Sequence, residues 1–153
     1  RMRIYSDSEL DLILNKIEPY PFQLFVRFAY YTGTRQGEIK CMTDDNIKSA
    51  FVIGKSGKRQ IKITSQAQTV LSEVEDLWNY SKNYICSKFK ENMERLEISD
   101  ARFHDLRRTF GYNLIKQGMP IYQVSKLLGH ASVTTTEKHY APLLATDVEE
   151  FVL

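Results

Sequence analysis

The chain has 153 residues, a formal net charge of +2 and 42% hydrophobic residues, values that fit a single globular domain with a buried core. No apolar run approaches the roughly 18 residues of a membrane span, and no secretory signal is visible. Because the chain starts at Arg1 rather than Met, we expect it to be a fragment of a longer protein.

The two cysteines do not indicate a metal site. Cys41 and Cys86 lie in helical patterns without the spacing of metal ligands. We therefore expect ordinary buried or half-buried thiols that stay reduced in a cytoplasmic protein.

Basic residues are concentrated in two stretches. Residues 54–63 contain four basic residues and no acid, and residues 101–140 contain six basic and two acidic residues together with all three histidines. The last thirteen residues, by contrast, carry three acids and no base. A basic face with acidic flanks is typical of a DNA-binding surface, although many charged runs are only solvated faces.

The N-terminal segment predicts a helix that begins after Ser6. Ser6 and Glu9 form a capping box, and Tyr5 and Leu10 have the spacing of a hydrophobic staple. Apolar residues then recur at helical spacing as far as Ile17, before two prolines interrupt the pattern.

A second helix is predicted over residues 21–32, with Pro21 in its first turn and Gly33 after its end. It is apolar on nearly every side, so we expect it to be buried. Arg35 opens a short third helix, where free backbone N–H groups favour an anion.

A β-hairpin is predicted next. Residues 50–53 form its first strand, residues 54–58 the turn and residues 59–64 the second strand, in which Ile61 and Ile63 share a face.

Helical periodicity dominates the rest of the chain. Helices are expected over about 65–80, 81–97, 103–116 before Gly118, 121–128 before Gly129, and after Ser132. The predicted fold class is therefore mainly α with a small antiparallel β-hairpin.

One tyrosine, two arginines and two or three histidines form a set with a recognisable chemical use. Arginines can hold a phosphate, histidines can manage its protons, and a tyrosine can attack it. His104 and Arg107 lie three residues apart and share one helix face. Each residue also has a plainer explanation: His130 could cap a helix, Tyr140 could belong to the core, and Lys55 could be a solvated turn residue.

Four segments, in order and with appropriate spacing, resemble the tyrosine recombinases, the phage-integrase family. They are T-G-T-R-Q-G-E-I at 32–39, F-H-D-L-R-R-T-F at 103–110, L-L-G-H-A-S at 127–132 and T-T-E-K-H-Y-A-P at 135–142. The resemblance implies a catalytic-domain fold over residues 1–153 and site-specific DNA recombination or integration through a 3′-phosphotyrosine intermediate. The N-terminal domain with which relatives clamp the other face of DNA is absent from this sequence.

The resemblance also implies a role for each matched residue. Two arginines would hold the scissile phosphate, a hairpin lysine would protonate the leaving 5′-oxygen, two histidines would stabilise the transition state, and the tyrosine would attack. These catalytic residues are Arg35, Lys55, His104, Arg107, His130 and Tyr140, with Glu38 in support and DNA contacts from Lys58, Arg59, Arg108 and Lys126. Lys58 is a second candidate for the leaving-group acid.

Much of the family has its tyrosine one residue closer to the second histidine, at the position of His139 here. The H-Y arrangement recurs in the family, so the nucleophile is assigned to Tyr140, with His139 as the alternative. The acidic and apolar tail, residues 147–153, corresponds to a region that often packs onto a neighbouring subunit in relatives.

The same resemblance implies double-stranded DNA and further recombinase subunits as partners, as a tetramer on DNA, without a membrane. The chain shows no carboxylate cluster of the kind used by two-metal nucleases, so we expect no metal. Covalent capture conserves the energy of the phosphodiester, so we expect no nucleotide cofactor either.

Three alternatives remain open. A type IB topoisomerase shares the tyrosine, arginines and histidine. Residues 121–136 also fit a helix-turn-helix, which would allow a DNA-binding module without chemistry. A metal-free hydrolytic nuclease is the third, although no acid stands beside either histidine to activate water.

Overall fold

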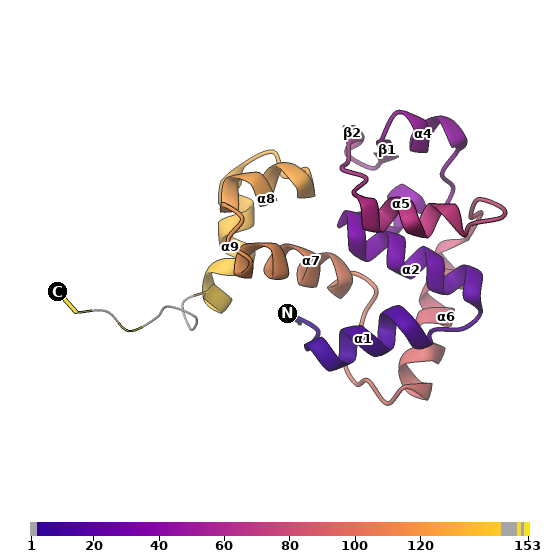
Figure 1. Cartoon of the computed structure of the whole chain (residues 1–153), viewed down its shortest axis with the longest axis horizontal. Helices are drawn as coiled ribbons and strands as arrows, with labels where there is room; N and C mark the ends of the chain where they lie inside the picture. The colour runs from indigo at the N-terminus through magenta and orange to yellow at the C-terminus, as the bar shows by residue number, and fades with distance from the viewer. Residues whose placement is uncertain (1–2, 145–149, 151) are drawn as a thin grey trace.

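The computed structural model describes residues 3–144, 150, 152 and 153, and it shows a mainly helical protein (Figure 1). The only sheet of the described residues is an antiparallel pair of strands, so the predicted fold class is confirmed. The elements are α1 (Asp7–Lys16), α2 (Tyr20–Thr32), α3 (Gln36–Ile39), α4 (Asp44–Lys48), β1 (Phe51–Gly54), β2 (Gly57–Gln60), α5 (Ser65–Ser72), α6 (Lys82–Arg95), α7 (Asp105–Lys116), α8 (Ile121–Leu128) and α9 (Val133–Leu144).

The helices gather into two groups that α7 joins. Figure 1 shows α7, α8 and α9 at one end of the molecule and the other elements at the opposite end. The larger core surrounds α2, whose three phenylalanines, Phe22, Phe25 and Phe28, are fully buried. Leu106 of α7 belongs to this core, whereas Phe110 packs against the smaller core between α7, α8 and α9. Consequently the first turns of α7 lie at the junction of the two groups.

The predicted start of α1 is confirmed. The Ser6 hydroxyl accepts a hydrogen bond from the Glu9 backbone N–H at 3.2 Å, and the Glu9 carboxylate accepts one from the Ser6 N–H at 2.9 Å. Tyr5 and Leu10 are both buried, as a hydrophobic staple requires. The burial of α2 is confirmed as well.

The predicted hairpin is present, but its limits were wrong. Gly54 pairs with Gly57, so the turn consists of two residues, and Gly57 directly after it has a positive φ of 96°, which glycine adopts without strain. The second strand ends at Gln60 instead of continuing to residue 64. Beyond it Ile61 turns inward to become buried, and Thr64 caps α5.

The predicted helix over 65–80 was too long, because α5 ends at Ser72. Acidic residues follow immediately, and negative charge is unfavourable at the C-terminal end of a helix. Beyond the end of α5, the Trp78 indole N–H donates to the Pro21 carbonyl at 3.1 Å. Sequence analysis also missed α4, a helix of five residues.

The expectation for the cysteines was wrong, since both thiols are exposed. Cys41 lies in the turn after α3, where its Sγ is 3.3 Å from the Asn79 side-chain oxygen. Cys86 lies on α6 beside the buried Ile85, but the helix turns its side chain toward solvent.

No helix of the described residues is long and apolar enough to cross a membrane. Most of the C-terminal tail, for which a neighbouring subunit was expected as a partner, falls on residues 145–149 and 151, outside those the structure describes.

Candidate active site

The first turn of α7 carries the H-x-x-R pair. His104 is the N-cap residue, and Arg107 lies almost fully buried one turn later. The Arg107 guanidinium donates from Nη1 to the Gly33 carbonyl at 2.7 Å and from Nη2 to the Leu128 carbonyl. Each of these nitrogens carries a second N–H. Arg107 therefore joins the ends of α2 and α8 and keeps donors for a further acceptor.

Gly33 is required at the end of α2 for two reasons. Its φ of 68° is a left-handed conformation that glycine adopts without strain. In addition, a Cβ at this position would lie 2.4 Å from the ring of Phe110, so only glycine allows α7 to approach this closely. The glycine of the T-G-T-R segment thus positions the carbonyl that receives Arg107.

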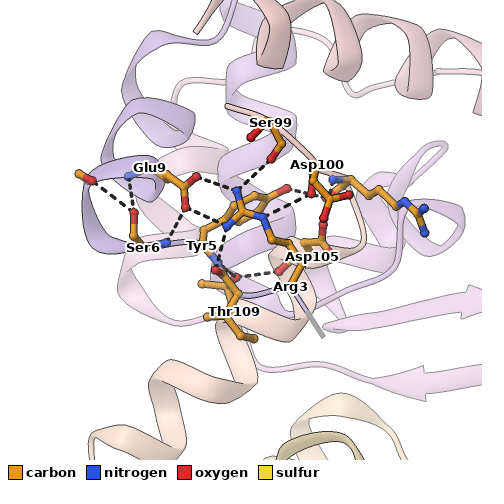
Figure 2. Close-up of polar contacts among 11 residues, drawn as sticks. Arg3, Tyr5, Ser6, Glu9, Ser99, Asp100, Asp105 and Thr109 are labelled. Carbon is orange, nitrogen blue, oxygen red and sulfur yellow. Dashed lines mark hydrogen bonds and ion pairs between the residues drawn. The ribbon is translucent and has the colours of Figure 1, made fainter. Parts of the chain in front are cut away.

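The loop before α7 is held by the N-terminal segment (Figure 2). Arg3 donates to both carboxylate oxygens of Glu9, at 2.9 and 2.7 Å, and to the carbonyls of Ser99 and Asp100 at 3.1 and 3.3 Å. The hydrogen bond from Arg3 lowers the pKa of Glu9 to about 2, so the pair stays ionised at neutral pH.

Hydrogen bonds within the same network hold the His104 end of α7. The Tyr5 backbone N–H donates to the Thr109 hydroxyl at 3.0 Å, and the Tyr5 hydroxyl donates to the Arg102 carbonyl at 2.6 Å. The fully buried Asp105 carboxylate accepts from the Arg102 backbone N–H at 2.9 Å and from Arg108 at 3.1 Å. Sequence analysis did not identify Asp105, because no pattern indicated which partners its carboxylate would meet.

Arg35 is the N-cap residue of the short α3, and Glu38 is the third residue of that helix. The Arg35 backbone N–H donates to Glu38 Oε1 at 2.7 Å, so this carboxylate occupies the anion-favouring position predicted there. The Arg35 side chain is 39% exposed, and its Nη1 lies 3.8 Å from Glu38 Oε2. Its guanidinium is therefore largely free to meet a ligand.

A cavity of about 490 Å³ brings together three of the predicted catalytic residues, Arg35, Lys55 and His104. Glu38 and Lys40 line it too. Lys58, the other candidate for the hairpin lysine, instead places its ammonium 4.1 Å from the centre of the Phe51 ring.

Both predicted catalytic histidines are neutral at pH 7. His104 is partly removed from water, and this is the main reason that its pKa falls to about 4. The positive charges of Arg108, Arg107 and Arg35 lower this pKa further. Burial and the charges of Arg107, His139 and Arg35 do the same for His130, whose pKa is also about 4.

His130 is further fixed by neighbours on α9. Its Nδ1 lies 2.5 Å from the hydroxyl of the buried Thr136, and its ring stacks on that of His139 with centroids 5.6 Å apart. The Thr136 contact was not predicted, since three consecutive threonines gave no reason to single one out.

Burial, together with the charges of Arg35 and Arg59, lowers the pKa of Arg107 to about 9, which leaves it charged at neutral pH. The charge of Arg35 thus acts on His104, Arg107 and His130 alike. Four predicted residues from three segments therefore share one electrostatic environment, although Arg107 and His130 do not line the cavity.

Tyr140 lies apart from the cavity. It is only 2% exposed and belongs to the small core with Val124 and Leu128. Burial raises the pKa of its hydroxyl to about 12, against the opposing influence of Arg107 and Arg108. In this conformation the hydroxyl is a poor nucleophile.

The residues expected to contact DNA fall into two kinds. Lys58 and Lys126 are exposed, and each lies over an aromatic ring. Arg59 and Arg108 are instead engaged by carboxylates, Glu38 and Asp105 respectively. Over the described ranges, no three His, Cys, Asp or Glu side chains group as a metal site requires.

The chain is similar in sequence to curated tyrosine recombinases. The chain is 27% identical over 154 residues to tyrosine recombinase XerC of Herpetosiphon aurantiacus, covering 84% of this chain and 50% of that protein. It is 26% identical over 163 residues to XerC of Roseiflexus castenholzii, covering 86% and 51%. The chain thus spans about half the length of the curated relatives it matches.

Solved structures share the fold. The catalytic domain of bacteriophage HP1 integrase superposes with a TM-score of 0.75 at 18% identity, covering 92% of this chain and 88% of that one. XerA recombinase gives a TM-score of 0.74 at 18% identity, covering 99% and 67%. The model of the phage integrase family matches residues 4–146, so the chain belongs to that family.

Proposed function

We propose that residues 1–153 form the catalytic domain of a site-specific tyrosine recombinase, which cuts and rejoins DNA through a 3′-phosphotyrosine. The observation that carries the proposal is the convergence of basic residues at the start of α7: Arg35 and His104 share a cavity with Lys55, and the charge of Arg35 reaches Arg107 and His130.

The chemistry follows from these groups. Arg35 and the free N–H groups of Arg107 hold the non-bridging oxygens of the phosphate and offset the charge that develops on them. The hydroxyl oxygen of Tyr140 bonds to phosphorus while the bond to the 5′-oxygen breaks. The proton of Tyr140 passes to a neutral imidazole or to water, and Lys55 protonates the leaving 5′-oxygen. Rejoining is the reverse reaction and consumes no nucleotide.

The buried position of Tyr140 adds a step to this mechanism. Its hydroxyl lies against Gly111 in the small core rather than at the cavity. We infer that α9 shifts when DNA binds and brings Tyr140 to the phosphate beside Arg107. Such a movement would also lower the pKa of the hydroxyl, because the ring would leave the apolar core and approach positive charge.

We further propose double-stranded DNA and other copies of the recombinase, as a tetramer, as partners, with no metal or cofactor. Relatives support the DNA assignment: the Tn1549 transposon integrase was solved with circular intermediate DNA and XerH with its difH substrate. The exposed lysines Lys58 and Lys126 are suited to phosphate contacts. We also propose a cytoplasmic location, because the proposed substrate is DNA.

The test is covalent capture on a nicked suicide substrate, from which a short fragment diffuses away so that rejoining is prevented. The expected product is a protein–DNA adduct resistant to denaturant, formed by the wild type and strongly reduced in Arg35→Ala. DNA binding without an adduct favours the helix-turn-helix alternative. Hydrolysed DNA without an adduct favours a nuclease, and relaxation of supercoils without a defined site favours a topoisomerase.

A further inference from the structure

Arg59 of β2 is bound on every nitrogen of its side chain. Nε donates to Glu38 Oε2 at 2.7 Å, and Nη2 donates to Glu38 Oε1 at 2.9 Å. The remaining nitrogen, Nη1, donates to the Leu127 carbonyl at 3.1 Å. The side chain is 14% exposed. Three of the five guanidinium N–H groups are thus used inside the protein, by a paired contact with a carboxylate and by a carbonyl, so the plane of the side chain is fixed.

These contacts connect the hairpin to two other elements of the site. Through Glu38, Arg59 reaches α3, whose N-cap is Arg35. Through the Leu127 carbonyl it reaches the last turn of α8, two residues before Gly129 ends that helix. Arg59 itself lies four residues after Lys55, directly across the ladder from Val52.

The end of α8 is shaped to receive this side chain. A Cβ on Gly129 would lie 2.6 Å from Cδ of Arg59, so the glycine leaves room for the arginine stem as well as adopting a φ of 72°. Arg107 binds the next carbonyl, that of Leu128. Two guanidiniums therefore hold the negative end of the α8 dipole, immediately before His130.

Glu38 is suited to be the shared anchor. Its burial favours the neutral form, but the hydrogen bonds from Arg59 and from the Arg35 backbone keep its pKa below the ordinary value, so it remains charged. The fixed carboxylate locks the orientation of the Arg59 plane, and with it the distance between the hairpin and α8.

We propose that Arg59 is a positioning residue, which holds the Lys55 turn and the His130 end of α8 in one geometry so that leaving-group protonation and transition-state stabilisation are set together. This inference rests on the proposed recombinase function. It replaces the DNA contact expected for Arg59 from the sequence with a contact inside the protein.

The decisive variant is Arg59→Lys, which keeps the charge but cannot reach Glu38 and Leu127 with a planar fork. The matched control is Arg27→Lys, since Arg27 also joins two elements, by donating to the Leu14 carbonyl at 2.6 Å, and is remote from the cavity. With the full chain and saturating suicide substrate, we expect adduct formation to slow by about 10- to 100-fold in Arg59→Lys, while DNA affinity and its salt dependence stay unchanged. Arg27→Lys should match the wild type.

A substrate with a bridging 5′-sulfur tests the link to Lys55. A thiolate leaves readily without protonation, because thiols are far more acidic than alcohols. The modified substrate should restore most of the rate lost in Lys55→Ala and a part of that lost in Arg59→Lys, the rest being due to displaced His130. A normal rate in Arg59→Lys, or weaker DNA binding with an unchanged saturated rate, would overturn the inference.

Amide hydrogen exchange separates this inference from the proposed function, because it needs no catalysis. In Arg59→Lys, exchange should accelerate together in the hairpin, residues 51–60, and at 128–130, but not in Arg27→Lys. Glu38→Gln, which preserves shape and weakens the anchor, should show the same paired change if Arg59→Lys fails to fold. If exchange accelerates only in the hairpin in both Arg59→Lys and Glu38→Gln, the proposed coupling between the hairpin and the end of α8 is contradicted, whether or not an adduct forms. If exchange accelerates in both segments but neither the wild type nor any variant forms an adduct, only the recombinase function is contradicted.

Discussion

The hydroxyl of Tyr140 lies against the backbone of Gly111, so closely that a Cβ on the glycine would be 2.2 Å from the tyrosine oxygen. Gly111 is buried within α7, three and four residues after Arg108 and Arg107. The proposed nucleophile is therefore packed in the small core against the same helix that carries one of the proposed phosphate ligands, one turn after Arg107.

Gly111→Ala should displace Tyr140 and destabilise the protein. Alanine is favoured over glycine in a helix by about 1 kcal/mol, but overpacking a buried contact costs about 1–3 kcal/mol, and Tyr140 is only 2% exposed. Urea unfolding should show a net loss of about 1–2 kcal/mol. Gly37→Ala is the control, since a Cβ there meets no atom within 4 Å. An increase in stability in Gly111→Ala would show that Tyr140 moves aside freely.

Removing Arg107 and removing Arg35 should have different effects on stability. Arg107→Ala leaves the buried Gly33 and Leu128 carbonyls without their donors, and each such loss costs about 1–3 kcal/mol. Arg35→Ala removes a side chain that is 39% exposed, so we expect a change within about 0.5 kcal/mol. Both variants should lose adduct formation. Equal stability of the two variants in urea would contradict the buried placement of Arg107.

The two histidines should make stability depend on pH in a defined range. Their folded-state pKa of about 4 lies below the unfolded value of about 6.5, so the unfolded chain binds more protons between these limits. Stability should therefore be complete above about pH 7 and fall as the pH drops toward 4. Thermal unfolding between about pH 7 and pH 5, where carboxylates stay ionised, should show this slope, and His104→Gln with His130→Gln should flatten it. An unchanged slope in the double variant would show that His104 and His130 are not the source of the pH dependence.

Affinity for DNA should fall steeply as salt rises. Each neutralised phosphate releases counterions and adds about 0.9 to the slope of log affinity against log salt. Lys126→Ala should therefore reduce that slope by about 0.9, the contribution of one phosphate contact, whereas Arg59→Lys should leave the slope unchanged. Fluorescence anisotropy over a salt series measures both, and a slope near zero for the wild type would exclude an interface dominated by phosphates.

The sequence was most informative where structure depends on neighbours along the chain. The Ser6 capping box, the helix end at Gly33 and the His104–Arg107 spacing follow from local rules, and the structure confirms them. The family motifs identified the residues that approach each other at the start of α7.

Features that depend on contacts through space were missed. The partners of Arg59 lie 21 and 68 residues away, so no local pattern separated it from a solvated DNA contact. The predicted helix over 65–80 ends early, at Ser72, although Trp78 beyond it still packs on Phe25 and Phe28 of α2. The burial of Tyr140 depends likewise on the packing of α7, α8 and α9.

The measurement that tests the central claim most directly is identification of the residue joined to DNA. His139 stacks on His130 and is less buried than Tyr140, which makes it a real competitor in this conformation. After capture on the suicide substrate and proteolysis, mass spectrometry should find the 3′-phosphate on Tyr140, and Tyr140→Phe should bind DNA normally without forming an adduct. A nucleotide on His139, or an adduct that persists in Tyr140→Phe, would contradict the account.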